Sequence, residues 1–585
     1  MPTVASPKRA SSRGCSWLMN PTPDPTPAPP ETLQNGARTG QQNARGSTEE
    51  SQNARVKDLI AQSLFFAALA FSLFVALRWA KQPLLDQHDF RQTQTALSTY
   101  WLAQHSGLAH WLDYETPVFG SPWQIPMELP LFQWLVALVH VLSGIPLDPA
   151  GRCLSALLFY CALWPISMLV RDLGFDRRCF HLTAGLLLLS PVYIYWSRAF
   201  LIESTALLLS LLYVAWLQRY LRSNRHRFIT FATAAGTLAI LTKVTTFATF
   251  AAAGGCLATA HIIHTKGWKQ VGPAIRIYLP VLASVLVCGI CLETWLRHSD
   301  AIKASSFFGN ILTAKALHGW TYGTLAQKAS LALWWSTIAQ RAVPEAVGSS
   351  LALLVCLLAA SRMDRRVGWI VAALLLFFLL PFLVFTNLHI VHNYYQYANA
   401  LFLVTAVALS LWQLSQRSSV LVLALACGLV IIGDVVSFSR TYLPSVKADY
   451  SNDTRLEVSR FLRDKTPQNS VILVAGYGWS PVIAYYSQRR TIYIPQWATS
   501  EQIRTLLQSP SRFTGGLRIS AVVQYLKGDP PVGTDLWRNF AGALSLDSTS
   551  AAFGDFQCLL PHSPEAWVKA CAAQSKLPMR PSRLR

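Results

Sequence analysis

The chain has 585 residues, of which 52% are apolar and 14% charged, with a formal net charge of +21. Runs of about 18 to 23 apolar residues, the length that crosses bilayer hydrocarbon, recur along the first three quarters. This composition excludes an ordinary soluble domain. The basic residues lie mostly in short loops between apolar runs and at both ends, a pattern typical of membrane topology rather than of nucleic-acid binding. We therefore expect an α-helical polytopic membrane protein that binds no nucleic acid.

The N-terminal segment 1–57 is rich in Pro, Ser, Thr, Gln and Arg and lacks apolar periodicity, so we predict a disordered tail. The tail is too long and polar for the start of a cleaved signal peptide, and the run from Leu59 to Ala80 is therefore predicted to be an uncleaved first span. Its seven Lys or Arg residues against four acids favour a cytoplasmic N-terminus.

Later apolar runs raise the expected number of crossings to about eleven. The predicted spans are residues 58–80, 151–170, 181–197, 202–218, 228–242, 245–264, 274–294, 344–361, 367–386, 397–414 and 419–437. The run from Leu129 to Ser143 is short and follows Pro and Glu, and we interpret it as a juxtamembrane helix on the membrane face. With that assignment, alternate loops hold most of the basic residues. The positive-inside rule then places these loops in the cytoplasm.

The opposite loops then lie outside. They comprise a first outer loop at 81–150, the turn at Arg198, Lys243, a second large outer loop at 295–343, and the turn from His389 to Gln396. The transmembrane domain, 58–437, is followed by residues 438–585, which we expect to form an outer α/β domain. The predicted elements of that domain are helices at 454–464 and 501–508 and strands at 470–475, 491–495 and 519–525. Cys558 and Cys571 are the one candidate disulfide.

Four polar clusters interrupt the apolar chain. The first holds Asp86, His88, Asp89 and Arg91. Either acid could simply cap the helix predicted at 93–104. However, such a density of charge next to hydrocarbon is costly unless the groups have partners or a function, and we favour function here.

The second and third clusters contain Glu128, between two prolines, and the pair Arg198 and Glu203 at a span boundary. Glu128 could only complement a helix N-terminus, Arg198 and Glu203 could form a structural ion pair, and Lys243 could snorkel to the surface. The functional alternative is that Arg198 faces an anionic phosphate while Glu203 orients it.

The fourth cluster is an aromatic and imidazole-rich turn made of His389, His392, Asn393, Tyr394 and Tyr395. Tyrosines belong at a membrane interface in any case, but two histidines and an asparagine do not. The turn therefore indicates a contact for a phosphate or a sugar.

In these residues the chain resembles the GT-C glycosyltransferases, including the protein O-mannosyltransferases and the lipid A aminoarabinose transferases. His88-Asp89-Phe-Arg91 falls where those families carry Asp-Glu-x-Arg, and Met127-Glu128-Leu-Pro130 is similar to their Glu-Lys-Pro. Ser197-Arg198, with Glu203 five residues beyond Arg198, resembles the mannosyltransferase pattern. The first acid of Asp-Glu is His88 here, and the lysine of Glu-Lys-Pro is Leu129.

The resemblance implies an inverting transfer of a sugar from a polyprenyl-phosphate donor to a hydroxyl of a protein, lipid or polysaccharide acceptor, on the outer face of an inner (plasma) membrane. Asp89 would be the general base, with Asp86 the alternative, and Arg198 with Arg91, His392 or Lys243 would hold the phosphate. The reaction requires no cofactor, and the sequence leaves a divalent metal open.

Two other classes of protein fit the same composition. A flippase or transporter of lipid-linked sugars would carry its polar groups near the bilayer midplane on broken helices, whereas the clusters here gather at one interface. A non-catalytic assembly protein for surface glycans is the second alternative.

Overall fold

The structure is a computed structural model that describes residues 31–104, 112–266, 271–527 and 534–575. The tail before Glu31 and residues 105–111 of the first outer loop lie outside the described residues. The chain divides into two compact units, residues 1–56 and 57–585. In the first unit, residues 31–56 belong to helix α1 (Glu31–Arg78), where the sequence had predicted a disordered tail. This stretch contains many Gln, Glu, Arg and Ala residues, which have high helix propensity.

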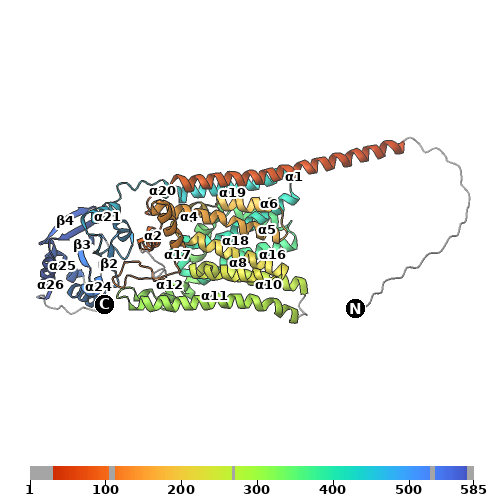
Figure 1. Ribbon diagram of the computed structural model, residues 1–585. Coiled ribbons are helices and arrows are strands. Elements are labelled where there is room, and N and C mark those ends of the chain that lie inside the picture. Colours follow the sequence, from red (N-terminus) through yellow and green to blue (C-terminus); the bar gives the residue numbers. More distant parts are fainter. Residues whose placement is uncertain (1–30, 105–111, 267–270, 528–533, 576–585) are drawn as a thin grey trace, which may run out of the picture. The chain divides into compact units, whose positions relative to one another are not determined.

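The second unit begins with a helical bundle (Figure 1). After α1, its helices before the C-terminal domain are α2 (Asp89–Gln104), α3 (Leu131–Ser143), α4 (Leu147–Cys161), α5 (Leu163–Asp172), α6 (Arg177–Leu189), α7 (Pro191–Trp196), α8 (Glu203–Ser223), α9 (His226–Thr242), α10 (Val244–Lys266), α11 (Val271–Ser305), η2 (Asn310–Leu312), α12 (His318–Tyr322), α13 (Leu325–Ala329), η3 (Ala332–Ala342), α14 (Val343–Val347), α15 (Ala352–Ala360), α16 (Arg365–Val384), α17 (Thr386–Val391), η4 (Asn393–Tyr395), α18 (Gln396–Arg417), α19 (Val420–Thr441) and α20 (Leu443–Lys447).

Among the described residues, seven helices are long and apolar enough to cross a membrane, or eight if the bent pair Ala332–Val347 and Ala352–Ala360 is one span. The protein is a multi-pass membrane protein, as the sequence predicted. The number is below the predicted eleven partly because α6 and α9 have only 13 and 17 residues, shorter than the ~20 residues that span hydrocarbon. Helix α3 also has 13 residues and is too short to cross.

Helix α18 is the centre of the bundle. Eighteen of its 22 residues are buried, and it packs against α6, α15 and α16. A helix that is apolar on all sides is stable only when other helices surround it. Its N-terminal end carries the predicted histidine and tyrosine turn, so this turn is held by the most buried of the candidate membrane spans among the described residues.

The C-terminal part is a mixed α/β domain, as predicted (Figure 1). Its strand order is β2-β1-β3-β5-β4, with β1 parallel to both β2 and β3, and β5 antiparallel to β3 and β4. The elements are α21 (Thr454–Lys465), β1 (Ser470–Ala475), α22 (Val482–Ser487), β2 (Arg490–Ile494), α23 (Ser500–Gln508), α24 (Ser511–Thr514), β3 (Arg518–Tyr525), α25 (Thr534–Ser545), β4 (Ser548–Phe553), β5 (Phe556–Pro561) and α26 (Pro564–Ser575).

The disulfide considered for Cys558 and Cys571 does not form, because both thiols are free. Cys558 is buried in the sheet core. The Cys571 thiol instead donates a hydrogen bond to the Leu507 carbonyl oxygen at 3.0 Å, so each cysteine is accommodated separately.

The first outer loop and the C-terminal domain share one hydrophobic core. Phe119 forms an antiparallel bridge with Ile492 of β2, and the Tyr493 amide donates to the Val118 carbonyl at 2.8 Å. This pairing covers the outer edge of β2, which would otherwise expose unpaired backbone groups. The loop that carries the first two polar clusters is therefore packed against the sheet domain.

Candidate active site at one end of the bundle

The four polar clusters meet in space. His88 hydrogen-bonds Asn393 at 3.0 Å, which joins the first cluster to the fourth. Arg91 forms an ion pair with Glu128 of the second cluster at 2.8 Å. Segments up to 305 residues apart in the sequence thus form a single site.

The third cluster joins the same site through Arg198, whose guanidinium lies 3.5 Å from the Asp86 carboxylate. Glu203 forms an ion pair with Lys243 at 2.5 Å instead. Arg198 and Glu203 therefore do not pair with each other. Each pairs with a residue of another segment, Asp86 or Lys243, and so links its own turn to another part of the site.

The basic loops predicted to be cytoplasmic gather at the other end of the bundle. Arg178 pairs with Asp58 at 2.7 Å and Arg219 with Asp172 at 3.0 Å. Asp58 lies near the start of the first span, whereas Asp86 follows the end of that span, after Arg78. The polar site and the basic loops are consequently separated by the length of a membrane-spanning helix.

Asp86 is a buried structural centre. It is 4% exposed, and its carboxylate accepts hydrogen bonds from Arg152 at 3.0 Å and from Gln92 at 2.6 Å, in addition to the Arg198 contact. Burial alone would raise the pKa of Asp86, but the two guanidiniums together hold it below its usual range. Burial and the neighbouring Arg152 lower the pKa of Arg198 to about 10, so this guanidinium stays protonated at neutral pH.

Asp89 is the more accessible acid. It is the first residue of α2, and its side chain is 28% exposed. One carboxylate oxygen accepts the Phe90 amide at 2.7 Å, and the other accepts from Arg455 of the C-terminal domain at 2.5 Å. Burial raises the pKa of Asp89, and the Arg455 guanidinium offsets only part of this rise. A carboxylate oxygen has two lone pairs, so each oxygen retains one that can accept a hydrogen bond from a hydroxyl, and the carboxylate can take up one proton.

Two cations lie beside the paired tyrosines. The Lys243 ammonium is 4.2 Å from the Tyr395 ring centroid and 5.1 Å from that of Tyr394. Arg91 also interacts electrostatically with both tyrosines and with Lys243. The side chains of Arg91 and Lys243 are 17% and 9% exposed, respectively. Two adjacent, partly accessible cations next to aromatic faces suit a phosphorylated sugar.

The histidines beside Tyr394 and Tyr395 are uncharged at neutral pH. Burial, followed by the Lys243 charge, lowers the pKa of His389 to about 3, and burial lowers that of His392 to about 4. His88 packs edge-on against His392 at 5.1 Å and against Tyr394 at 4.9 Å. These imidazoles can donate or accept hydrogen bonds but do not add positive charge at neutral pH.

Three arginines at the site were not predicted from the sequence. Arg152 lies in an apolar helix, Arg455 is 366 residues from its partner Asp89, and Arg341 belongs to the π-helix η3. Arg341 donates to the His389 and Ile390 carbonyl oxygens, and its Nε has no hydrogen-bond partner among the described residues. For Arg152, an isolated Arg at the start of an apolar run was the available signal.

The described residues contain no group of three or more His, Cys, Asp or Glu side chains placed to hold a metal ion. The carboxylates of the site form ion pairs with arginines and with Lys243.

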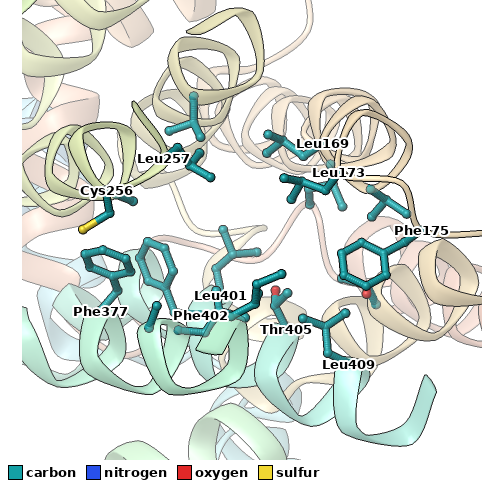
Figure 2. Close-up of a pocket in the computed structure, with 18 of the residues that line it drawn as sticks. Leu169, Leu173, Phe175, Cys256, Leu257, Phe377, Leu401, Phe402, Thr405 and Leu409 are labelled. Atoms are coloured by element: carbon teal, nitrogen blue, oxygen red, sulfur yellow. The ribbon is translucent and has the colours of Figure 1, made fainter. Parts of the chain in front are cut away.

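An apolar cavity of about 320 Å³ lies deeper in the bundle. Figure 2 shows that Leu169, Leu257, Phe377, Phe402 and Leu409, from four different helices, surround it. Another lining residue, Phe250, is seven residues after Lys243 on the next helix, about 10 Å along the axis. The lining also includes Phe175 and Cys179, which lie on either side of Arg177 and Arg178, so the cavity extends to the basic end of the bundle.

No protein-family model matches the sequence, and no curated protein matches it. Solved structures do match. ArnT from Cupriavidus metallidurans bound to undecaprenyl phosphate is similar over 84% of this chain and 97% of its own, with 12% identity and a TM-score of 0.57. This chain has the GT-C fold. A second GT-C structure, the arabinofuranosyltransferase AftD from Mycobacteria, matches over 86% of this chain and 40% of its own, with 15% identity and a TM-score of 0.51.

These two matches confirm the predicted fold class, a helical GT-C membrane protein with a C-terminal α/β domain. At 12% and 15% identity they establish the GT-C fold alone, so the reaction rests on the residues of the site.

Proposed function

We propose that this GT-C-fold protein is a glycosyltransferase that moves a sugar from a polyprenyl-phosphate donor to a hydroxyl acceptor, with inversion at the anomeric carbon. The observation that carries the proposal is the convergence of Asp89, Arg91 and Lys243 at one end of the bundle. Asp89, whose carboxylate is partly exposed, is the first residue of the helix that also carries Arg91. Arg91 interacts electrostatically with Lys243 and with the stacked rings of Tyr394 and Tyr395.

Asp89 serves as the general base. It takes the proton of the acceptor hydroxyl while the acceptor oxygen forms a bond to the anomeric carbon of the donor. The bond between that carbon and the phosphate oxygen breaks, and its electron pair leaves with the polyprenyl phosphate. The raised pKa of Asp89 suits this role, because a base is most effective when its pKa approaches the working pH.

Arg91 and Lys243 stabilise the charge that grows on the leaving phosphate. Glu128 and Glu203 orient these two cations through the ion pairs described above. Arg341, whose Nε has no hydrogen-bond partner in the described part of the chain, lies near the histidine turn and is a third cation in this region. Asp86 and Arg198 hold the supporting turns in position.

The apolar cavity receives part of the prenyl chain. Its lining is almost entirely hydrocarbon, so a prenyl unit that moves from the bilayer into the cavity stays in an apolar environment. The similar ArnT structure holds undecaprenyl phosphate as its bound lipid, and that likeness supports a lipid phosphate donor for this chain.

The site lies on the outer face of an inner (plasma) membrane, with the N-terminus in the cytoplasm and the C-terminal domain in the periplasmic or extracellular space. The gathering of Arg178, Arg219 and Arg417 at the opposite end supports this orientation through the positive-inside rule.

Proteoliposomes containing a labelled polyprenyl-phosphate sugar test the proposal. We expect the wild-type protein to release free polyprenyl phosphate and to label an added membrane extract. Movement of the intact donor between leaflets without bond cleavage would instead identify a flippase. Donor binding with neither cleavage nor movement would identify a non-catalytic assembly protein.

A further inference from the structure

The loop at residues 476–481 of the C-terminal domain brings two partly exposed aromatic residues to the proposed active site. The loop follows β1, which pairs in parallel with β2 on one side and β3 on the other. The chain leaves β1 to form β2 and later returns on the opposite side to form β3. In open α/β sheets, ligands bind beyond the carboxyl ends of the strands where the strand order reverses in this way.

The backbone at this position is unusually tight. Gly476 has a φ of +78°, and a Cβ there would lie 2.6 Å from the Tyr525 carbonyl oxygen at the end of β3. Glycine is therefore required both for the conformation and for the close approach of the two strand ends. Gly478 also has a positive φ, of +60°, but no atom lies within 4 Å of a Cβ placed there. Tyr477, Trp479 and Ser480 in this loop are partly exposed.

Trp479 is the aromatic residue of this loop that reaches helix α2, which begins at Asp89. Its ring packs edge-on against Phe90 at 4.6 Å and lies 5.2 Å from Phe119. Phe90 is adjacent to Asp89 in the sequence. Trp479 is only partly buried, and its indole N–H donates no hydrogen bond within the described part of the chain.

Trp497 provides an instructive comparison. It also packs near Phe119, at 6.2 Å, but its indole N–H donates to the Phe308 carbonyl oxygen at 3.3 Å. Indole N–H groups in packing roles usually find such a partner. Trp479 therefore differs from Trp497, because its ring is partly exposed and its indole N–H has no hydrogen-bond partner among the described residues.

Polar groups lie in the same loop as Trp479 and beside Phe90, which its ring contacts. Tyr477, two residues earlier, interacts with Asp89 and Arg455. Arg455 in turn is held by Asp453 at 2.6 Å while it contacts Asp89 at 2.5 Å. An apolar ring with a few directed polar groups at its rim is the usual composition of a small-molecule binding site.

We propose that the acceptor is a carbohydrate, one of whose rings stacks on Trp479 so that a hydroxyl reaches Asp89. This proposal rests on the transferase function proposed above and names its acceptor class. A sugar ring presents a flat face of C–H groups and a rim of hydroxyls. The first matches the Trp479 face, and the second matches the indole N–H, Tyr477 and the charged pair of Asp89 and Arg455.

Binding of the purified full-length protein to an immobilised oligosaccharide array, without donor, tests the proposal. The same sugars displayed on lipid vesicles distinguish a free glycan from a lipid-borne one, and a Ser/Thr-rich peptide represents a protein acceptor. We expect the wild type to bind a subset of the sugars. Trp479→Ala should weaken this binding roughly tenfold, the expected loss of one stacked ring.

Two variants separate stacking from folding. Trp479→Phe keeps an aromatic face and should retain most of the binding, whereas Trp497→Phe removes a packing hydrogen bond and should bind like the wild type. Wild-type binding strength in Trp479→Ala, or wild-type binding of the peptide and of no sugar, would overturn the proposal. Since no donor is present, either result would leave the donor-cleavage test of the transferase function unaffected.

Discussion

The two aspartates of the first polar cluster are three residues apart but have different environments. Asp86 is enclosed by Arg152, Arg198 and Gln92, whereas Asp89 is partly exposed and faces the C-terminal domain. The spacing of acids in the sequence could not reveal this difference, because the arginines that surround Asp86 are 66 and 112 residues away.

Replacement of Asp86 should therefore destabilise the protein. Asp86→Asn leaves two buried guanidiniums without their carboxylate, which costs about 3–5 kcal/mol. We expect a clearly lower melting temperature in detergent, while Asp89→Asn, at a partly exposed position, should melt close to the wild type. An Asp86→Asn protein that melts normally and has lost transfer would make Asp86 the base.

The pH dependence of transfer should report on Asp89. A base must be deprotonated, so kcat/KM should fall as the pH drops through the pKa of Asp89, which burial raises above the ordinary value of ~3.9. The Arg455 charge lowers this pKa, so Arg455→Gln should raise it and shift the acidic limb to higher pH. Arg455→Lys, which keeps a charge, should shift it less. An acidic limb that stays in place in Arg455→Gln would contradict the assignment.

At the scale of elements, the first outer loop is locked to the sheet domain at Gly120. This residue has a φ of +89°, and a Cβ would lie 2.8 Å from the Phe513 carbonyl oxygen, which accepts the Ser121 amide. Gly120→Ala should therefore lower the melting temperature and make residues 112–125 sensitive to limited proteolysis. Gly144→Ala is the matched control, because Gly144 also has a positive φ, +70°, but open space around it. Equal effects of the two substitutions would contradict this lock.

The helices around the apolar cavity should select the donor by chain length. Thr405 lines the cavity on α18 (Figure 2), and Thr405→Phe would fill part of it. We expect a higher KM for donors with long prenyl chains and little change for a short-chain analogue. Leu425→Phe, at a position 65% exposed on α19, is the control. An equal rise in KM for both chain lengths would contradict binding of the prenyl chain in the cavity.

The sequence predicted elements best where local pattern and burial agree. Strand β1 matches the prediction residue for residue, because Ser470–Ala475 is a short apolar run and every residue in it is buried. Strand β4 was not predicted, since Ser548–Phe553 is half exposed and has no apolar alternation. Its conformation depends on pairing with β5, and such tertiary contacts leave little trace in one sequence.

For the molecule as a whole, the apolar runs and the charges of the loops predicted a polytopic helical protein whose polar clusters share one side, and the resemblance of its motifs implied the GT-C architecture. The ion pairs within the site could not be predicted, because Asp89 and Arg455 are brought together only when the C-terminal domain packs on the first outer loop. The pairing of Arg198 with Asp86, in place of Glu203, likewise depends on how the turn at 197–202 packs.

This packing makes the C-terminal domain part of the proposed active site. It supplies Arg455 to Asp89 and completes the core that orders the first outer loop. The proposed base Asp89 pairs with Arg455 of the C-terminal domain, whereas Arg91 and Lys243 pair with Glu128 and Glu203 of the membrane part. We therefore expect both parts to be needed for transfer.

The most direct test of this account is single-turnover release of polyprenyl phosphate from a labelled donor by folded Asp89→Asn protein. With a melting temperature close to that of the wild type, this variant should bind the donor normally and transfer its sugar at least about a hundredfold more slowly, since general base catalysis contributes ~10²–10⁴. Wild-type rates of release by the folded variant would contradict the role of Asp89 at the centre of the site.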